Sequence, residues 1–285
     1  MEEGGAEKQT AEMLFDAIAR GNVSVVKSML SKGVDANAWG EVDSERDPPL
    51  VAAARRGDKK GFEIARLLAE AGAELDALGG YDCAALHFAV LRDLGDDWAL
   101  ARFLLRSGAS PNLCNKDNLN VPESAENEGC EDAVIALLEE GMAPNLEGSC
   151  GSLLWYVSWQ SPRLVEELIR RGADVDAQKG YGAPLHRAVE AYACSSSEES
   201  AHVIALLTEF GAEINCEDGD GRTPLHIAAK YGSKNGCLQL IEKGANLEAI
   251  DGQGKTAFEI AKGEAKDYLF SQIERRVFDA AIAKK

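Results

Sequence analysis

Apolar residues recur along this chain at helical spacing, in short runs that mostly end in a pair of large aliphatic residues. The clearest pairs are Leu104-Leu105, Leu137-Leu138, Leu168-Ile169 and Leu206-Leu207. A glycine, in most cases followed by alanine, comes soon after each run, at Gly33, Gly72, Gly108, Gly141, Gly172, Gly211 and Gly244. Glycine readily ends a helix in a left-handed conformation. The pattern therefore predicts a succession of similar helical units.

A second pattern accompanies the runs. Its clearest copy extends from Thr223 to Ala229, TPLHIAA, with partial copies at residues 48–53, 84–89 and 183–188 and weaker ones at 152–155 and 256–261. It resembles the signature of the ankyrin-repeat family, whose unit is about 33 residues long. The resemblance implies an all-α solenoid of about seven helix-turn-helix repeats and a degenerate C-terminal cap, with short finger hairpins between repeats.

The repeats extend over nearly the whole chain. We expect a flexible N-terminal tail at residues 1–10 and a single ankyrin-repeat domain at 11–285, elongated and monomeric before it binds a partner. Threonine caps a helix and proline fits its first turn, which explains the start of the signature. A lone helix pair cannot bury both faces, so the units are stabilised by stacking on one another.

Several segments depart from the repeat. Extra residues fall at 56–62, 93–98 and 193–200, and residues 39–47 lengthen the first finger; we expect loops there. The fourth unit, residues 120–125, has polar residues where the signature is apolar. We expect residues 115–135 to be the loosest part of the stack.

Composition and charge limit the classes of partner. The formal net charge is −18, which disfavours nucleic acid and makes a basic protein the obvious complement. No run approaches the roughly 18 apolar residues of a membrane helix, and the acidic start is unlike a secretory signal. We therefore expect no membrane partner and a soluble protein of the cytoplasm or nucleus.

Candidate catalytic and metal-binding residues are explained by the repeat. His87, His186 and His226 each stand at the signature position, where the resemblance implies a structural histidine that links the turn to the adjacent repeat. Asp218-Gly219-Asp220-Gly221 resembles part of a calcium loop but lacks its later ligands and closing glutamate. We expect no catalytic residue, metal or cofactor.

A binding surface remains. Ankyrin proteins usually bind through the concave face, formed by finger tips and the exposed side of each first helix. Transferred position by position, that rule nominates Trp39, Arg55, Arg56, Tyr81, Leu91, Arg92, Trp159, Glu190, Asp220, Arg222, Lys230 and Tyr231. These positions carry both charge signs, so an acidic ligand fits the sequence as well as a basic one.

The tryptophans are the sharpest candidates among these positions. Trp39 and Trp159 align with sites where the fold does not require a buried ring, so we expect both to be partner anchors. Trp98 aligns with a buried leucine of a second helix, and we expect it in the core. Trp155 occupies a signature histidine position and is compatible with either role.

The function that follows is protein binding. The favoured interpretation is a non-catalytic adaptor or scaffold that recognises a partner protein or peptide segment in the concave groove. Two alternatives stay open: an acidic chaperone or inhibitor that masks a basic client, and a regulatory or targeting subunit of an enzyme complex.

Overall fold

The computed structural model describes residues 3–38, 40–42, 45–91, 97–148, 151–159, 161–178 and 181–283. Across these residues the chain forms sixteen α-helices, one short 3-10 helix and one two-stranded hairpin. This confirms the predicted all-helical fold with a finger hairpin. The chain divides into two compact units, Met1–Ala143 (unit 1) and Pro144–Lys285 (unit 2). The single ankyrin-repeat domain expected at 11–285 stays a prediction.

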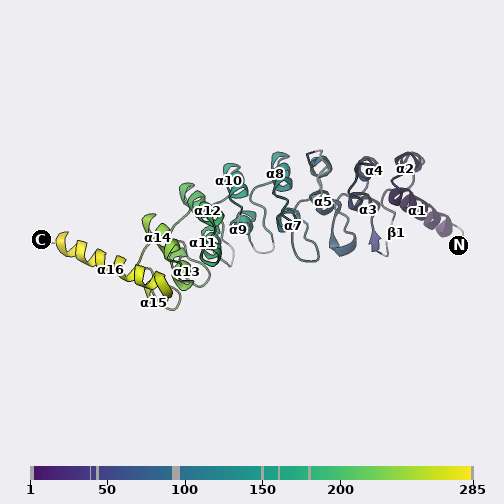
Figure 1. The fold of residues 1–285 in the computed structure, drawn as a ribbon. Coiled ribbons are helices and arrows are strands. Elements are labelled where there is room, and N and C mark those ends of the chain that lie inside the picture. The colour runs from purple at the N-terminus through teal and green to yellow at the C-terminus, as the bar shows by residue number, and fades with distance from the viewer. Residues whose placement is uncertain are drawn as a thin grey trace. The chain divides into compact units, whose positions relative to one another are not determined.

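Unit 1 contains four consecutive helix pairs. They are α1 (Glu3–Ala19) with α2 (Val23–Ser31), α3 (Pro49–Arg55) with α4 (Lys59–Glu70), α5 (Ala85–Ala89) with α6 (Ala99–Arg106), and α7 (Val121–Asn127) with α8 (Glu131–Glu139). The first helices pack as one row, and the second helices as another (Figure 1). The hairpin, β1 (Gly40–Val42) and β2 (Glu45–Asp47), is antiparallel, and a 3-10 turn spans Gly80–Asp82. Residues 3–10, expected as a flexible tail, belong to α1.

Unit 2 repeats this arrangement. Its pairs are α9 (Leu153–Val157) with α10 (Pro162–Arg170), α11 (Pro184–Ser195) with α12 (Glu198–Glu209), α13 (Pro224–Lys230) with α14 (Lys234–Glu242), and α15 (Ala257–Ile260) with α16 (Gly263–Ala283). The helices α9, α11, α13 and α15 form the inner row, and α10 and α12 pack side by side in the outer row (Figure 1). The last pair is the predicted degenerate cap.

A polar residue lies four positions after most of the helix-ending glycines and connects its loop to the loop of the next repeat. Asn145, for example, follows Gly141 and bonds to the loop at Gly172, a glycine with a φ of +91°. The Gly172 carbonyl accepts a hydrogen bond from Asn145 Nδ2 at 3.1 Å, and Asn145 Oδ1 accepts one from the backbone N–H of Asp174 at 2.8 Å. Asn37, Asp76, Asp176 and Asn215 accept the equivalent backbone bond. These bonds satisfy exposed backbone groups and fix each repeat on the next.

Two of the signature histidines, His186 and His226, are structural, as the resemblance implied. The Nδ1 atoms of His186 and His226 accept hydrogen bonds from the backbone N–H groups of Ala183 and Thr223, both at 3.1 Å. On the opposite side of each ring, Nε2 lies 2.9 Å from the carbonyl of Arg222 and 3.0 Å from that of Lys255. Each histidine therefore connects its own helix start to the finger of the next repeat.

Three expectations about the irregular segments are wrong. The extra residues at 193–200 do not form a long loop, because α11 extends to Ser195 and α12 begins at Glu198. Of the loop expected at 56–62, only residues 56–58 lie between helices, because α4 begins at Lys59. Trp98 is not a core residue: it is half-buried, precedes α6 with a φ of +58°, and does not lie within the second helix.

The fourth repeat is polar but buried. Residues 120–126 have little exposure, and Glu126 is only 4% exposed. Asn120 and Glu123 form a reciprocal capping box, with bonds of 3.0 Å in both directions between side chain and backbone. Burial, with a smaller contribution from the charge of Glu131, raises the pKa of Glu126 to about 7. The looseness of residues 115–135 stays a prediction.

Candidate functional site

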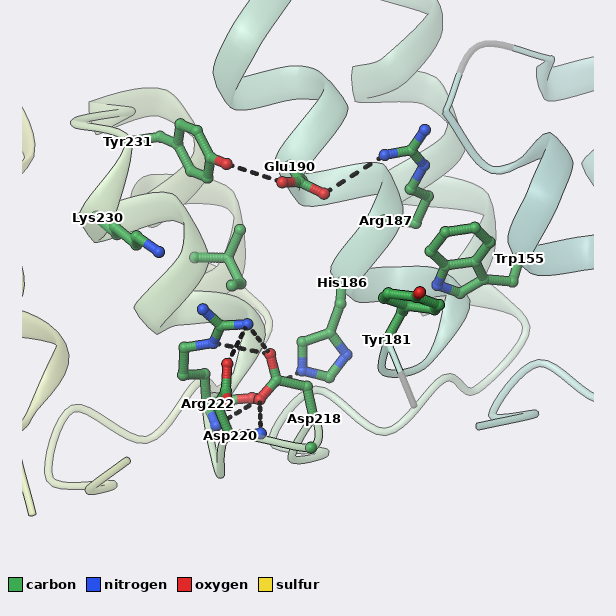
Figure 2. A pocket seen from close by; sticks show the side chains of 12 residues that line it. Trp155, Tyr181, His186, Arg187, Glu190, Asp218, Asp220, Arg222, Lys230 and Tyr231 are labelled. Atoms are coloured by element: carbon green, nitrogen blue, oxygen red, sulfur yellow. Dashed lines mark hydrogen bonds and ion pairs between the residues drawn. The ribbon is translucent and has the colours of Figure 1, made fainter. Parts of the chain in front are cut away.

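The candidate site is an open pocket of about 550 Å³ in unit 2. Its walls come from the inner helices α9, α11 and α13 and from the fingers that precede α11 and α13. Trp155, Tyr181, Arg187, Glu190, Arg222 and Tyr231 are among its lining residues (Figure 2). The pocket therefore lies where first helices and finger tips meet.

One end of the pocket is a cluster of aromatic rings around an arginine. The rings of Trp155 and Tyr181 lie 5.8 Å apart between centroids. The guanidinium carbon of Arg187 lies 5.1 Å from the Trp155 ring and 5.8 Å from the Trp159 ring. Both distances fall within the range in which a cation is attracted by an aromatic face. The cluster presents apolar surface together with a positive charge.

A carboxylate connects this cluster to the next repeat. Glu190, one turn after Arg187 on α11, accepts a hydrogen bond from the hydroxyl of Tyr231 at 2.8 Å. Its other oxygen lies 3.5 Å from Arg187 Nη1. The hydrogen bond to Glu190 raises the pKa of Tyr231, because it stabilises the protonated phenol. The hydrogen bond between Glu190 and Tyr231 thus connects α11 with the end of α13.

The opposite wall is the finger before α13. Asp218 Oδ1 accepts hydrogen bonds from the backbone N–H groups of Asp220 and Arg222, both at 2.9 Å, which closes the turn. The Arg222 guanidinium pairs with Asp218 Oδ2 at 2.8 Å and with Asp220 Oδ2 at 2.9 Å. Burial opposes the ionised form of Asp218, but these bonds outweigh it and lower its pKa. The two carboxylates of this finger therefore share one guanidinium, which leaves one net negative charge.

A second hollow of about 650 Å³ continues from the first. The two share Gly219, Asp220, Arg222 and Lys230, and the second ends at Lys262 and the finger before α15. We call the two hollows together the unit 2 groove. The ammonium groups of Lys230 and Lys262 are exposed and form no ion pair with the described residues.

The structure brings together most of the nominated residues of unit 2. Glu190, Asp220, Arg222, Lys230 and Tyr231 line the groove. Trp159 is not part of the lining but lies beside it, 41% exposed and next to Arg187. Trp155, for which two roles stayed open, lines the pocket and is half-buried. Partner binding by these residues stays a prediction.

Two nominated arginines of unit 1, Arg55 and Arg56, contact other parts of their own unit. Arg55 pairs at 3.2 Å with Asp47, which is fully buried, and its guanidinium lies 5.1 Å from the Phe88 ring. Arg56 donates hydrogen bonds to carbonyls at the end of α1, including that of Ile18 at 3.1 Å. Cations stabilise helix C-termini in this way. Both residues therefore contribute to the packing of unit 1.

The other nominated residues of unit 1 are less constrained. Tyr81 is 54% exposed, and Lys116 Nζ lies 3.9 Å from its ring centroid. Leu91 is half-buried. Trp39 and Arg92 lie outside the described residues, so the structure does not place them.

The sequence analysis did not nominate Tyr181 or Arg187, although the position of each residue within its repeat could have indicated it. Tyr181 follows a glycine in the finger, as Tyr81 does, and Tyr81 was nominated for that position. Arg187 occupies the variable position after the signature histidine, beside residues that line the groove. Comparing the variable positions of all repeats would have found both residues.

The described residues include no group of three or more His, Cys, Asp and Glu side chains arranged to hold a metal ion.

No helix in the described part of the chain has the length and apolar character that crossing a bilayer requires.

Stacked helix pairs, histidine-linked fingers and a groove on the inner helices define a helical repeat protein of the protein-binding class. The family described as ankyrin repeats (3 copies) matches residues 14–115, 153–251 and 185–273. The chain belongs to the ankyrin-repeat family. Ankyrin repeats mediate protein–protein interactions, and members of the family are generally non-catalytic binding proteins.

Three relatives illustrate the similarity. Ankyrin repeat and KH domain-containing protein mask-1 of Caenorhabditis elegans is 26% identical over 253 residues, covering 77% of this chain and 9% of that protein. The B-cell lymphoma 3 protein homolog of Mus musculus is 28% identical over 201 residues, 67% of this chain and 42% of that protein. Protein phosphatase 1 regulatory subunit 12A of Mus musculus is 30% identical over 97 residues, 34% of this chain and 9% of that protein. The chain spans less than half the length of each.

Proposed function

We propose that the protein is a non-catalytic adaptor or scaffold that holds a segment of a partner protein in the unit 2 groove. The observation that carries the proposal is the cluster of Trp155, Trp159, Tyr181 and Arg187. Aromatic and arginine side chains dominate the binding energy of protein interfaces. Exposed rings have little value for folding, and three rings of the site are exposed: Trp159 by 41%, Tyr181 by 68% and Tyr231 by 44%.

A regulatory or targeting subunit is the second candidate. The similarity to protein phosphatase 1 regulatory subunit 12A, limited to a third of this chain, supports it. In this role the groove would recognise the target, and the partner would supply the catalytic activity. The masking of a basic client has weaker support, because the groove itself contains both charge signs. Steep loss of partner binding with rising salt would favour masking over the adaptor.

Affinity purification with matched triple variants tests the groove. The full chain, immobilised, is exposed to lysate of the source cell, and captured proteins are identified by mass spectrometry. The groove variant carries Trp159→Ala, Tyr181→Ala and Tyr231→Ala. The control variant carries Phe210→Ala, Phe270→Ala and Phe278→Ala, three rings of unit 2 that are also exposed but lie outside the groove lining.

We expect a set of proteins that the wild type and the control variant capture and the groove variant loses. Loss of three anchors removes several kcal/mol of binding energy, on the order of 2 kcal/mol each. If all three baits capture the same proteins, or if only the control variant loses them, the groove is not the binding surface.

A further inference from the structure

We infer that the unit 2 groove selects an extended acidic peptide segment, with carboxylates of the segment beside Lys230 and Lys262. This inference rests on the proposed function, since it assumes that the groove binds a partner segment. It concerns the charge of the ligand, which the mixed signs of the sequence left open.

The first argument is that each carboxylate of the groove already accepts hydrogen bonds or ion pairs from groups of the chain itself. Glu190 accepts from Tyr231 and lies against Arg187, while Asp218 and Asp220 pair with Arg222. A basic ligand would have to share these carboxylates with their internal partners. Asp251, at the far end, accepts the backbone N–H groups of Gln253 and Lys255 through Oδ1.

The second argument is that the unused polar groups are donors. The ammonium groups of Lys230 and Lys262, with three donors each, form no hydrogen bond or ion pair with the described residues. At the aromatic end, the indole Nε1 of Trp155 and the Nε of Arg187 are buried without a hydrogen-bond partner. Buried donors are normally satisfied, so a ligand that shifts these two side chains and supplies acceptors completes the site. Carboxylates are acceptors and carry the charge that lysine attracts.

The net charge of −18 opposes an acidic ligand at long range. At physiological ionic strength, however, charges farther away than about 8 Å are largely screened. The charges within the groove then decide which ligand stays bound, and the remote charge mainly slows association. Selection is therefore best measured near physiological salt.

A displayed library of random dodecapeptides, selected on the full chain at that salt, supplies the probe. We expect the enriched peptides to carry Asp or Glu at a constant distance from an apolar or aromatic residue. A synthetic copy of an enriched peptide is then compared with a copy in which Asn and Gln replace Asp and Glu. We expect the neutral copy to bind at least about tenfold more weakly.

Matched charge reversals locate the contact. Lys230→Glu with Lys262→Glu should weaken the acidic peptide by about tenfold or more. Lys234→Glu with Lys243→Glu changes the net charge equally at exposed positions, the first residue and the C-cap of the outer helix α14, and should change binding by less than about twofold. All four lysines are exposed, so both variants should melt like the wild type.

The outcomes separate this inference from the proposed function. Enriched peptides that are neutral or basic, yet lose binding to the variant with Trp159→Ala, Tyr181→Ala and Tyr231→Ala, overturn the acidic preference and leave the groove in place. Acidic peptides that bind both lysine variants equally also overturn it. Peptides that are insensitive to the aromatic variant contradict the proposed function itself.

Discussion

Trp159→Ala should bind the purified partner about thirtyfold more weakly than the wild type while remaining folded. Truncating a tryptophan anchor at an interface removes about 2 kcal/mol or more of binding energy, which corresponds to that factor in Kd. The ring is 41% exposed in the free protein, so its loss should reduce the free energy of unfolding by only about 1 kcal/mol. Calorimetric titration gives the Kd, and thermal melting gives the stability.

Phe210→Ala is the matched control, because this ring of unit 2 is 44% exposed but lies outside the groove lining. Its Kd should stay within about twofold of the wild type, as for a residue outside the interface. If Trp159→Ala unfolds the protein, or binds as tightly as the control, the fifth repeat does not contribute an anchor and Arg187 does not mark the binding surface.

Glu126→Gln should stabilise the protein by about 3 kcal/mol at pH 8 and by only about 1 kcal/mol at pH 5.5. Burial raises the pKa of Glu126 to about 7 in the folded chain, against 4.5 for the free group. Between pH 4.5 and 7 the folded state therefore holds a proton that the unfolded state has released. The free energy of unfolding of the wild type decreases as the pH rises through this range. Glutamine removes this loss, because it stays neutral throughout.

Urea unfolding of the two proteins at both pH values measures the effect. Glu128→Gln, an exposed position at the end of the same helix α7, should change the free energy of unfolding by about 0.5 kcal/mol or less at either pH. A gain for Glu126→Gln that is equal at pH 5.5 and pH 8 would mean that titration of this buried carboxylate is not the cause.

The fold was predictable from sequence because its determinants are local and recur. The glycine that ends each second helix, the histidine of the signature and the residue that links neighbouring loops act within one repeat or between neighbours. His226, for example, hydrogen-bonds to Thr223 and Lys255 through its ring nitrogens. Short-range rules of this kind can be transferred from one copy to the next.

The segments that broke the repeat were harder to predict. The polar residues of the fourth repeat include Asn120 and Glu123, which satisfy each other in a capping box whose spacing was present in the sequence. Residues 193–200 were expected as a loop, yet added residues can lengthen two helices as readily as a connection. Trp98 was placed by alignment across an insertion, where the repeat register is lost.

The candidate site was predictable in outline only. The aligned positions of Glu190, Asp220, Arg222, Lys230 and Tyr231 do meet in one groove. Which charges are compensated inside that groove depends on side-chain geometry, and no spacing rule reveals it. Arg55 and Arg56 illustrate this limit, since their guanidinium groups pair with Asp47 and with Asp58 and the end of α1.

Hydrogen–deuterium exchange of the full chain, with and without its purified partner, tests most directly whether the unit 2 groove is the binding surface. We expect the partner to slow exchange in the fingers before α11 and α13 and in the inner helices α9, α11 and α13, which form the groove. The outer helices α10, α12 and α14 should change little. Protection confined to those outer helices, to α16 or to unit 1 would contradict the account.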